Sequence, residues 1–229
     1  MTLVSVWKKD KSKRDRFASA RERCDRNWPY HRERVKAAFL ELSSIDSRFS
    51  AHDRDEMTKL RADGDPIYHG YDYVILSEDD RVTPRRTIYS NGKSFHIDHE
   101  REEGGSITVH YTYGQALIQV FLKPPKSNKS IIEKTDILVW VGRNTDALTT
   151  AFCERLIGKY LILARAESNF ETSTILERFR IRWWRFMDMR NRLQIYDTHI
   201  NLLNRWELPV AAAILALASF AISLLKLRC

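Results

Sequence analysis

The sequence predicts an α+β protein with N-terminal helices, an antiparallel β-domain of five or six strands, and C-terminal helices that end in one transmembrane helix. Three observations predict this class. Apolar residues recur at helical spacing before residue 62 and after residue 142, they alternate with a period of two over 68–141, and the last apolar stretch carries no charge. The β-domain is expected to be either an antiparallel meander or a small barrel.

Four parts are expected along the chain: a basic helical region over 1–65, the β-domain over 66–145, a helical region over 146–207, and a membrane anchor over 208–225. The net charge of +8 is concentrated at the N-terminus, where residues 1–36 hold twelve Lys or Arg against five Asp or Glu. Such runs are usually solvated, and this one lacks the interleaved aromatic residues of a base-stacking surface. Nucleic acid is therefore not an expected partner.

Residues 11–62 are predicted to be helical. Pro29 should separate a leading helix over 11–27 from a second helix over 30–45, because proline removes a hydrogen bond and clashes within a helix. In the second helix, apolar residues recur near helical spacing and form one short stripe. These residues are Val35, Phe39, Leu42 and Ile45.

The β-domain is predicted from alternation and turn residues. Ile107, Val109, Tyr111 and Tyr113 share one face of a strand over 106–113, and polar residues occupy the other face. Asn91-Gly92 fits a two-residue hairpin turn, which needs positive φ at both positions. The other expected strands cover 68–76, 86–90, 93–98, 116–122 and 137–141.

Two C-terminal helices are predicted before the anchor. The first covers 146–166 and is expected to pack on the body, because it carries Glu154, Arg155 and Lys159. The second covers 175–206, and its apolar stripe and arginines fit either an interfacial membrane helix or a helix covering the β-domain. Its candidate membrane-interface residues are Arg178, Arg182, Trp183, Arg185 and Trp206.

The apolar segment 208–225 contains eighteen residues without a charge. As a helix it would be about 27 Å long, close to the hydrocarbon thickness of a bilayer. A single-pass anchor in the inner (cytoplasmic) membrane is expected, with the N-terminal body in the cytoplasm. Small residues on one face of this helix favour self-association and hence a homo-oligomer. These residues are Ala212, Ala216, Ser219 and Ser223.

Candidate sites for chemistry are few. No nucleophile elbow, P-loop or dinucleotide fingerprint is present, so an enzyme and a bound cofactor are not expected. The cluster 96–99 contains two histidines and an aspartate, but only His96 and Asp98 would share a strand face, so no metal site is predicted. Cys24, Cys153 and Cys229 form no disulfide or metal framework. Arg85 and Arg86, with Tyr111 and Tyr113, are the candidate residues for a small anionic or nucleotide ligand.

In outline, a β-domain over 68–141 coupled to a membrane span over 208–225 resembles the small membrane effectors of bacterial antiphage (cyclic-nucleotide-type) defence systems. Those effectors pair a β-barrel nucleotide sensor with transmembrane segments, although their paired spans precede the barrel and this chain shares no diagnostic motif with them. The resemblance implies a ligand-sensing effector that perturbs the membrane. The alternative is a membrane-anchored scaffold that binds a protein partner without enzymatic or pore activity.

Overall fold

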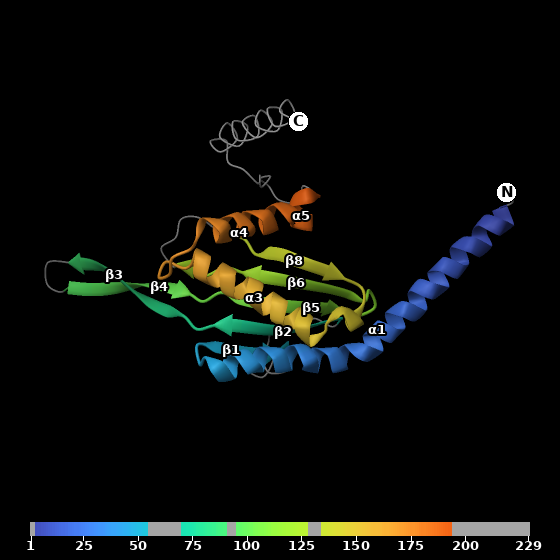
Figure 1. Ribbon diagram of the computed structural model, residues 1–229, viewed down its shortest axis with the longest axis horizontal. Coiled ribbons are helices and arrows are strands. Elements are labelled where there is room, and N and C mark those ends of the chain that lie inside the picture. Colours follow the sequence, from blue (N-terminus) through green and yellow to red (C-terminus); the bar gives the residue numbers. More distant parts are fainter. Residues whose placement is uncertain (1–2, 55–69, 91–94, 128–133, 194–229) are drawn as a thin grey trace, which may run out of the picture. The chain divides into compact units, whose positions relative to one another are not determined.

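The computed structural model describes residues 3–54, 70–90, 95–127 and 134–193 (Figure 1). The chain divides into two compact units, Met1–Arg178 and Phe179–Cys229, which are considered separately. The first unit contains an N-terminal helix and an antiparallel five-stranded sheet, so the predicted α+β class is confirmed at this level.

Helix α1 is continuous over Leu3–Ile45 and contains Pro29, so the predicted break at this proline is wrong. Residues on both sides of Pro29 are buried, including Cys24 and Trp28 before it and His31 and Val35 after it. Because both halves are held on the same sheet, tertiary packing offsets the hydrogen bond that proline cannot donate. Figure 1 shows that α1 changes direction close to the sheet and that its N-terminal part extends away from it.

The larger sheet has the strand order β1-β2-β5-β6-β8, and every neighbouring pair is antiparallel. Its strands are β1 (Phe49–Asp53), β2 (Tyr71–Glu78), β5 (Ser106–Thr112), β6 (Leu117–Lys123) and β8 (Ile137–Gly142). Among the described residues, the order begins at β1 and ends at β8, and the paired strands β3 (Arg81–Ser90) and β4 (Phe95–Glu103) lie between β2 and β5 in the sequence. Cross-strand partners Val74, Val109 and Val120 are buried on one face, which confirms the alternation predicted for 106–113.

Strand β1 lies within the segment predicted to be helical, and that prediction is wrong for its five residues. Phe49, Ala51 and Asp53 are buried while the residues between them are less so. The strand pairs with β2 along its whole length. Its short polar sequence gives little strand signal, so the conformation is set by pairing with a strand distant in sequence.

A second, three-stranded sheet has the order β3-β4-β7, formed by β3 (Arg81–Ser90), β4 (Phe95–Glu103) and β7 (Lys126–Ser127). The predicted antiparallel pairing of β3 with β4 is confirmed. Ser90 pairs with Phe95, whereas a two-residue turn would pair it with residue 93. The predicted turn residues Asn91 and Gly92 lie outside the described residues.

The 3-10 helix η1 (Thr145–Ala147) and helix α3 (Thr150–Glu167) follow β8, close to the predicted start of this helix. The Thr149 side chain caps α3 by accepting a hydrogen bond from the Phe152 amide. Figure 1 shows α3 lying across the larger sheet. Its Tyr160 is fully buried, packs edge-on against Phe49, and donates a hydrogen bond to the Gly105 carbonyl at 2.8 Å. Helix α3 therefore closes the core at the end where β5 begins.

Residues 168–171, named here the strap, connect α3 to the next helix and are fixed to the three-stranded sheet. The buried Glu102 carboxylate accepts hydrogen bonds from the Ser168 hydroxyl and the Asn169 amide, both at 2.7 Å. Arg81 pairs with Glu171 at 3.2 Å and lies over the Phe170 ring. The chain is thus held firmly where it leaves the sheets.

The second C-terminal helix is shorter than predicted. Helix α4 (Ile175–Met187) ends where the Asp188 side chain caps the four-residue helix α5 (Met189–Arg192) by accepting a hydrogen bond from the Arg190 amide. The predicted helical residues 194–206 lie outside the described part of the chain, as does the predicted anchor over 208–225. Among the residues that the structure does describe, no helix has the length and apolar character needed to cross a membrane.

Candidate functional site

The four residues predicted to bind a small anion are not brought together by the structure. Arg86 is exposed on β3 of the three-stranded sheet, and the side chain of Arg85 is outside the described set. Tyr111 lies in β5 of the other sheet, and Tyr113 follows that strand. The chain passes from β2 to β3 after Glu78, next to the first residues of β5. The two tyrosines lie at the opposite end of β5.

Tyr111 is a structural residue at the contact between α1 and the sheet. Its ring is fully buried and stacks on Trp28, with 4.5 Å between ring centroids and 8° between planes. Its hydroxyl donates a hydrogen bond to the Asp25 carboxylate at 2.5 Å. Burial, followed by the hydrogen bond to Asp25, raises the pKa of Tyr111 well above its usual value. The phenol is therefore neutral and acts as a fixed donor.

A second carboxylate, which is buried, holds α1 on the same face of the sheet. Asp72 of β2 accepts hydrogen bonds from the Trp28 indole at 2.8 Å and from the Arg32 guanidinium at 3.3 Å. Asp25, Trp28 and Arg32 recur at helical spacing and thus project from one side of α1. Through these contacts α1 lies over the start of β2 and the end of β5. The preceding turn of α1, which contains Arg21, then lies beside the β5–β6 turn.

The β5–β6 turn, residues 113–116, contains two residues with positive φ, Gly114 at +74° and the buried Ala116 at +48°. The Gly114 amide donates to Asp25 at 3.2 Å, and its carbonyl accepts a hydrogen bond from Arg21 at 3.3 Å. A left-handed conformation is unfavourable for alanine, so these helix contacts help to hold the turn. The turn and α1 together form the wall of a cavity.

This cavity, named here the arginine groove, has a volume of about 520 Å³. Its lining comes from α1, from the β5–β6 turn, and from the residue that follows β8. The lining residues are Arg14, Phe17, Ala20, Arg21, Ala116 and Arg143. Segments that are distant in sequence therefore bring three guanidinium groups to one cavity.

Among the described residues, the lining of the arginine groove contains three cationic side chains and no acidic one. Arg14 pairs with Asp10 at 2.7 Å on the exposed surface of α1, and Arg21 is held by the Gly114 carbonyl. Within the described residues, no hydrogen bond or ion pair holds the Arg143 guanidinium. Guanidinium groups bind carboxylates and phosphates through paired hydrogen bonds, and Phe17 and Ala116 supply apolar contact. The groove is thus suited to an anion that also has an apolar or aromatic part.

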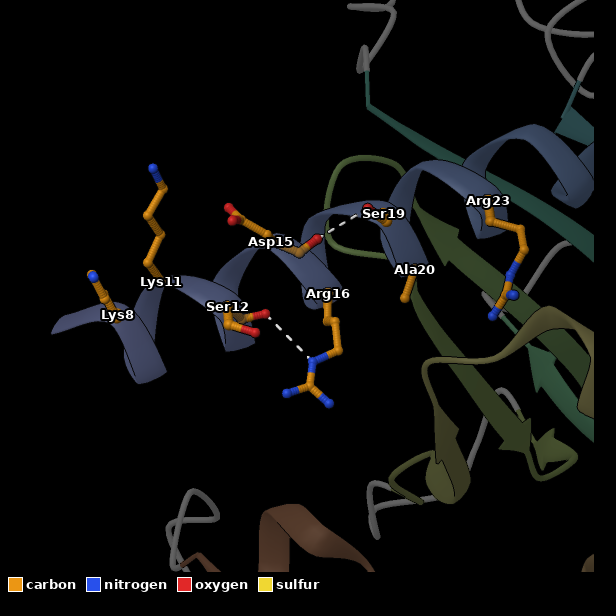
Figure 2. Close-up of a pocket in the computed structure, with 8 residues that line it drawn as sticks. All are labelled: Lys8, Lys11, Ser12, Asp15, Arg16, Ser19, Ala20 and Arg23. Carbon is orange, nitrogen blue, oxygen red and sulfur yellow. Dashed lines mark hydrogen bonds between the residues drawn. The ribbon is translucent and has the colours of Figure 1, made fainter. Parts of the chain in front are cut away.

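A second, shallower groove runs along the N-terminal part of α1 and is lined by this helix alone (Figure 2). Its lining includes Lys8, Lys11, Arg16 and Arg23 against the single acid Asp15. The hydrogen bonds drawn there are local, for example from Arg16 to the Ser12 carbonyl. Because one helix cannot enclose a small ligand, this groove is better described as a basic surface.

The sequence predicts no metal site, and the possible ligands and thiols of the described residues are placed as follows. None of their histidine, cysteine, aspartate and glutamate side chains form a group of three that could hold a metal. In the predicted cluster, His99 is exposed on β4 and the side chains of His96 and Asp98 lie outside the described set. Cys24 and Cys153 are free and buried, and burial raises the pKa of the Cys153 thiol to about 11, which makes it unreactive.

The predicted membrane-interface residues lie mainly on α4. In the first unit, Arg178 is exposed and donates to the Ser173 hydroxyl at 2.8 Å. In the second unit, Trp183 is 44% exposed, while Arg182 and Arg185 are half-buried. Trp206 lies outside the described residues, as do the predicted self-association residues Ala212, Ala216, Ser219 and Ser223.

Sequence reasoning missed the arginine groove because its cations lie far apart in the chain. Arg21 contacts a turn 93 residues away, and Arg143 follows the last strand of the sheet. One signal was available: Arg21, Asp25 and Trp28 recur at helical spacing, which indicates a single contacting face. Comparison of the chain with models of protein families, with curated proteins and with solved structures finds no match.

Proposed function

We propose that the protein is a membrane-anchored sensor whose body binds a small anionic ligand in the arginine groove. The observation that carries this proposal is the convergence of Arg14, Arg21 and Arg143 on one cavity whose lining contains no carboxylate. Phosphate groups, as in a nucleotide, fit this chemistry, and Phe17 offers a ring against which a base can pack. Of the two predicted tyrosines, Tyr111 is buried, so only Tyr113, which is partly exposed at the β5–β6 turn, remains accessible to a ligand.

The groove proposal is tested by calorimetry on the full chain with inorganic pyrophosphate and a panel of mono- and cyclic dinucleotides. Arg143→Ala is the informative variant, because no described contact depends on the Arg143 side chain. We expect it to weaken binding by roughly 10-fold or more, as expected for the loss of one charge-assisted hydrogen bond. Arg86→Ala removes an exposed arginine from the other sheet and should leave binding unchanged.

Two results would contradict this assignment. Absence of binding for every anion in the panel would remove the ligand-sensing role. Normal binding by Arg143→Ala together with loss of binding by Arg86→Ala would move the site to the three-stranded sheet.

The output of the sensor is proposed to be an effect on the inner membrane, in the manner of an antiphage effector. Support comes from the uncharged segment 208–225, which is long enough to span a bilayer, and from its face of small residues. The test is uptake of a membrane-impermeant dye by bacteria that express the full chain, residues 1–205, or Ala216→Leu. Only the full wild-type chain should admit the dye, and equal uptake with residues 1–205 would contradict the proposal.

The second candidate function is a membrane-anchored scaffold that binds a protein through the three-stranded sheet. One observation favours it: β3 leaves Val82 and Ile88 more than half exposed. Recovery of one stoichiometric partner by the wild type but not by Ile88→Glu, with membranes intact, would select the scaffold over the effector.

A further inference from the structure

The outer part of α1, residues 3–20, carries large apolar side chains in solvent. Leu3 is 85% exposed, Trp7 is 56% exposed, and Phe17 is 66% exposed; Val4 and Val6 are also exposed. Buried residues of α1 begin only at Cys24. A helix of this length is marginally stable without packing, so an exposed apolar face indicates a surface that covers it.

The apolar residues gather on one side of this outer segment. Leu3, Val6, Trp7 and Phe17 fall within about a third of the helix circumference at 100° per residue. Asp10 and Arg14 interrupt this side, but they form an ion pair with each other at 2.7 Å. The Arg14 guanidinium also lies over the Trp7 ring, 5.8 Å from its centroid. Pairing lowers the cost of placing these two charges near an apolar phase.

The remaining surface of the outer segment is strongly basic. Residues 3–20 contain six Lys or Arg against two Asp, and five of these cations flank the apolar side rather than interrupt it. Figure 2 shows the Lys8 and Lys11 side chains extending from the helix into open space. Lysines beside a strip of Val, Leu and Trp form the pattern of a helix that lies flat on an anionic bilayer.

From this pattern we propose that residues 3–20 bind the surface of an anionic lipid bilayer, with Leu3, Val6, Trp7 and Phe17 in the interface and the lysines at the headgroups. The lysines and the apolar strip of residues 3–20 distinguish among three possible binding partners: a second copy of α1, a nucleic acid and an anionic bilayer. A second copy of α1 would bring two rows of lysines together, and a nucleic acid would leave the apolar strip in water. Of these three partners, an anionic lipid surface alone buries the apolar strip and also places negative headgroups beside the lysines. Arg14 and Phe17 also line the arginine groove, so a bilayer and a groove ligand would compete for these two side chains, whereas Leu3, Val6 and Trp7 lie outside its lining.

The test uses the full chain in vesicles, with Cys229→Ser as background and the buried Cys24 and Cys153 retained. One variant carries a bimane label at Val6→Cys on the apolar side, and the other carries it at Ser12→Cys on the opposite side. Quenching by brominated lipid is then compared in phosphatidylcholine alone and with phosphatidylglycerol added. We expect strong quenching at position 6 and weak quenching at position 12, only when phosphatidylglycerol is present and only at low salt.

Charge reversal supplies the matched control. Lys8→Glu combined with Lys11→Glu should abolish the quenching at position 6, whereas Arg86→Glu, an exposed site on β3, should preserve it. Equal quenching at both positions, or quenching that ignores phosphatidylglycerol, would overturn the proposal. Energy transfer between labels on two copies would show that a second copy of the chain binds residues 3–20 instead of lipid. Burial of the label by added duplex DNA would show that a nucleic acid binds there instead.

Discussion

Asp25 shows how a few hydrogen-bonded polar residues hold the N-terminal helix in place. Its carboxylate accepts hydrogen bonds from the Tyr111 hydroxyl and from the Gly114 amide, while Asp72 binds the Trp28 indole. Buried polar groups are costly unless they are paired, so these contacts favour one helix register over its alternatives. The register in turn fixes where Arg14 and Arg21 lie.

Tyr111→Phe should lower the free energy of unfolding by about 1–2 kcal/mol, because Asp25 then loses one donor in a site with little water. The ring and its stacking on Trp28 are retained. Chemical denaturation of both proteins measures the difference. Tyr113→Phe is the control, since its ring is partly exposed, and it should change stability by less than about 0.5 kcal/mol. A larger effect at Tyr113 than at Tyr111 would contradict the assignment.

His110 makes stability depend on pH on the acid side of neutrality. Burial among Tyr73 and Phe121 lowers the pKa of His110, and Asp136 opposes this only in part. Above pH of about 6.5 the histidine is neutral in both folded and unfolded chains. As the pH falls below this value the unfolded chain binds the proton first, so stability decreases until the folded pKa is passed.

Replacing His110 with Phe should therefore reduce the loss of stability between pH 7 and pH 5. The measurement is the denaturation midpoint at each pH for the wild type and the variant. An unchanged pH profile in His110→Phe would show that another group controls the acid side.

Pro29 shows how packing overrides a local signal at the scale of the helix. A proline inside a helix leaves the carbonyl four residues earlier without its usual partner, and here that residue is Asp25. The helix continues because Trp28 and Val35 are fully buried on either side of the proline. The bend in α1 allows one helix both to cover the sheet and to extend away from it.

Pro29→Ala should raise the free energy of unfolding by roughly 1–3 kcal/mol, because it restores an amide donor inside the helix. Thermal or denaturant unfolding measures this change. Ala18→Gly, also in α1, is the comparison and should lower the free energy of unfolding. A destabilised Pro29→Ala protein would instead show that the bend is required for Asp25 and Trp28 to reach the sheet together.

The sequence predicts best those elements whose signal is local. The strand over 106–113 is predicted from its alternation, and it and the strand over 116–122 correspond to β5 and β6. Strand β1 was missed because Ser50 and His52 dilute its pattern, and its conformation depends on pairing with β2. The arginine groove was missed for the same reason, since Arg21 and Arg143 meet only through tertiary contacts. Conversely, the predicted ligand residues Arg86 and Tyr111 are not brought together, because they belong to different sheets.

At the scale of the whole molecule, the strap is the route by which the chain leaves the sheets toward α4. Glu102, which is almost fully buried, holds the Ser168 hydroxyl and the Asn169 amide. Arg81 adds an ion pair to Glu171 and a contact with Phe170. The chain therefore leaves the sheets through a segment held by contacts to both β3 and β4.

Glu102→Gln should loosen the strap, because it replaces a charged acceptor with a weaker neutral one and lowers stability by about 1–3 kcal/mol. Limited proteolysis and hydrogen exchange should show earlier opening of residues 168–174 than of β5. Glu103→Gln, an exposed neighbour on β4, serves as the control. If residues 168–174 stay as protected as in the wild type, the strap is held by Arg81 alone.

The long sequence separation of the α1 contacts also sets an order for biosynthesis. Trp28 donates a hydrogen bond to Asp72, 44 positions later, and Asp25 accepts one from Tyr111, 86 positions later. At about 5–20 residues per second, Asp25 is synthesised roughly 4–17 s before Tyr111. During that interval the nascent helix has its indole and its carboxylate exposed. Ribosome-stalled chains ending before β5 should thus bind chaperones that chains ending after β8 no longer bind.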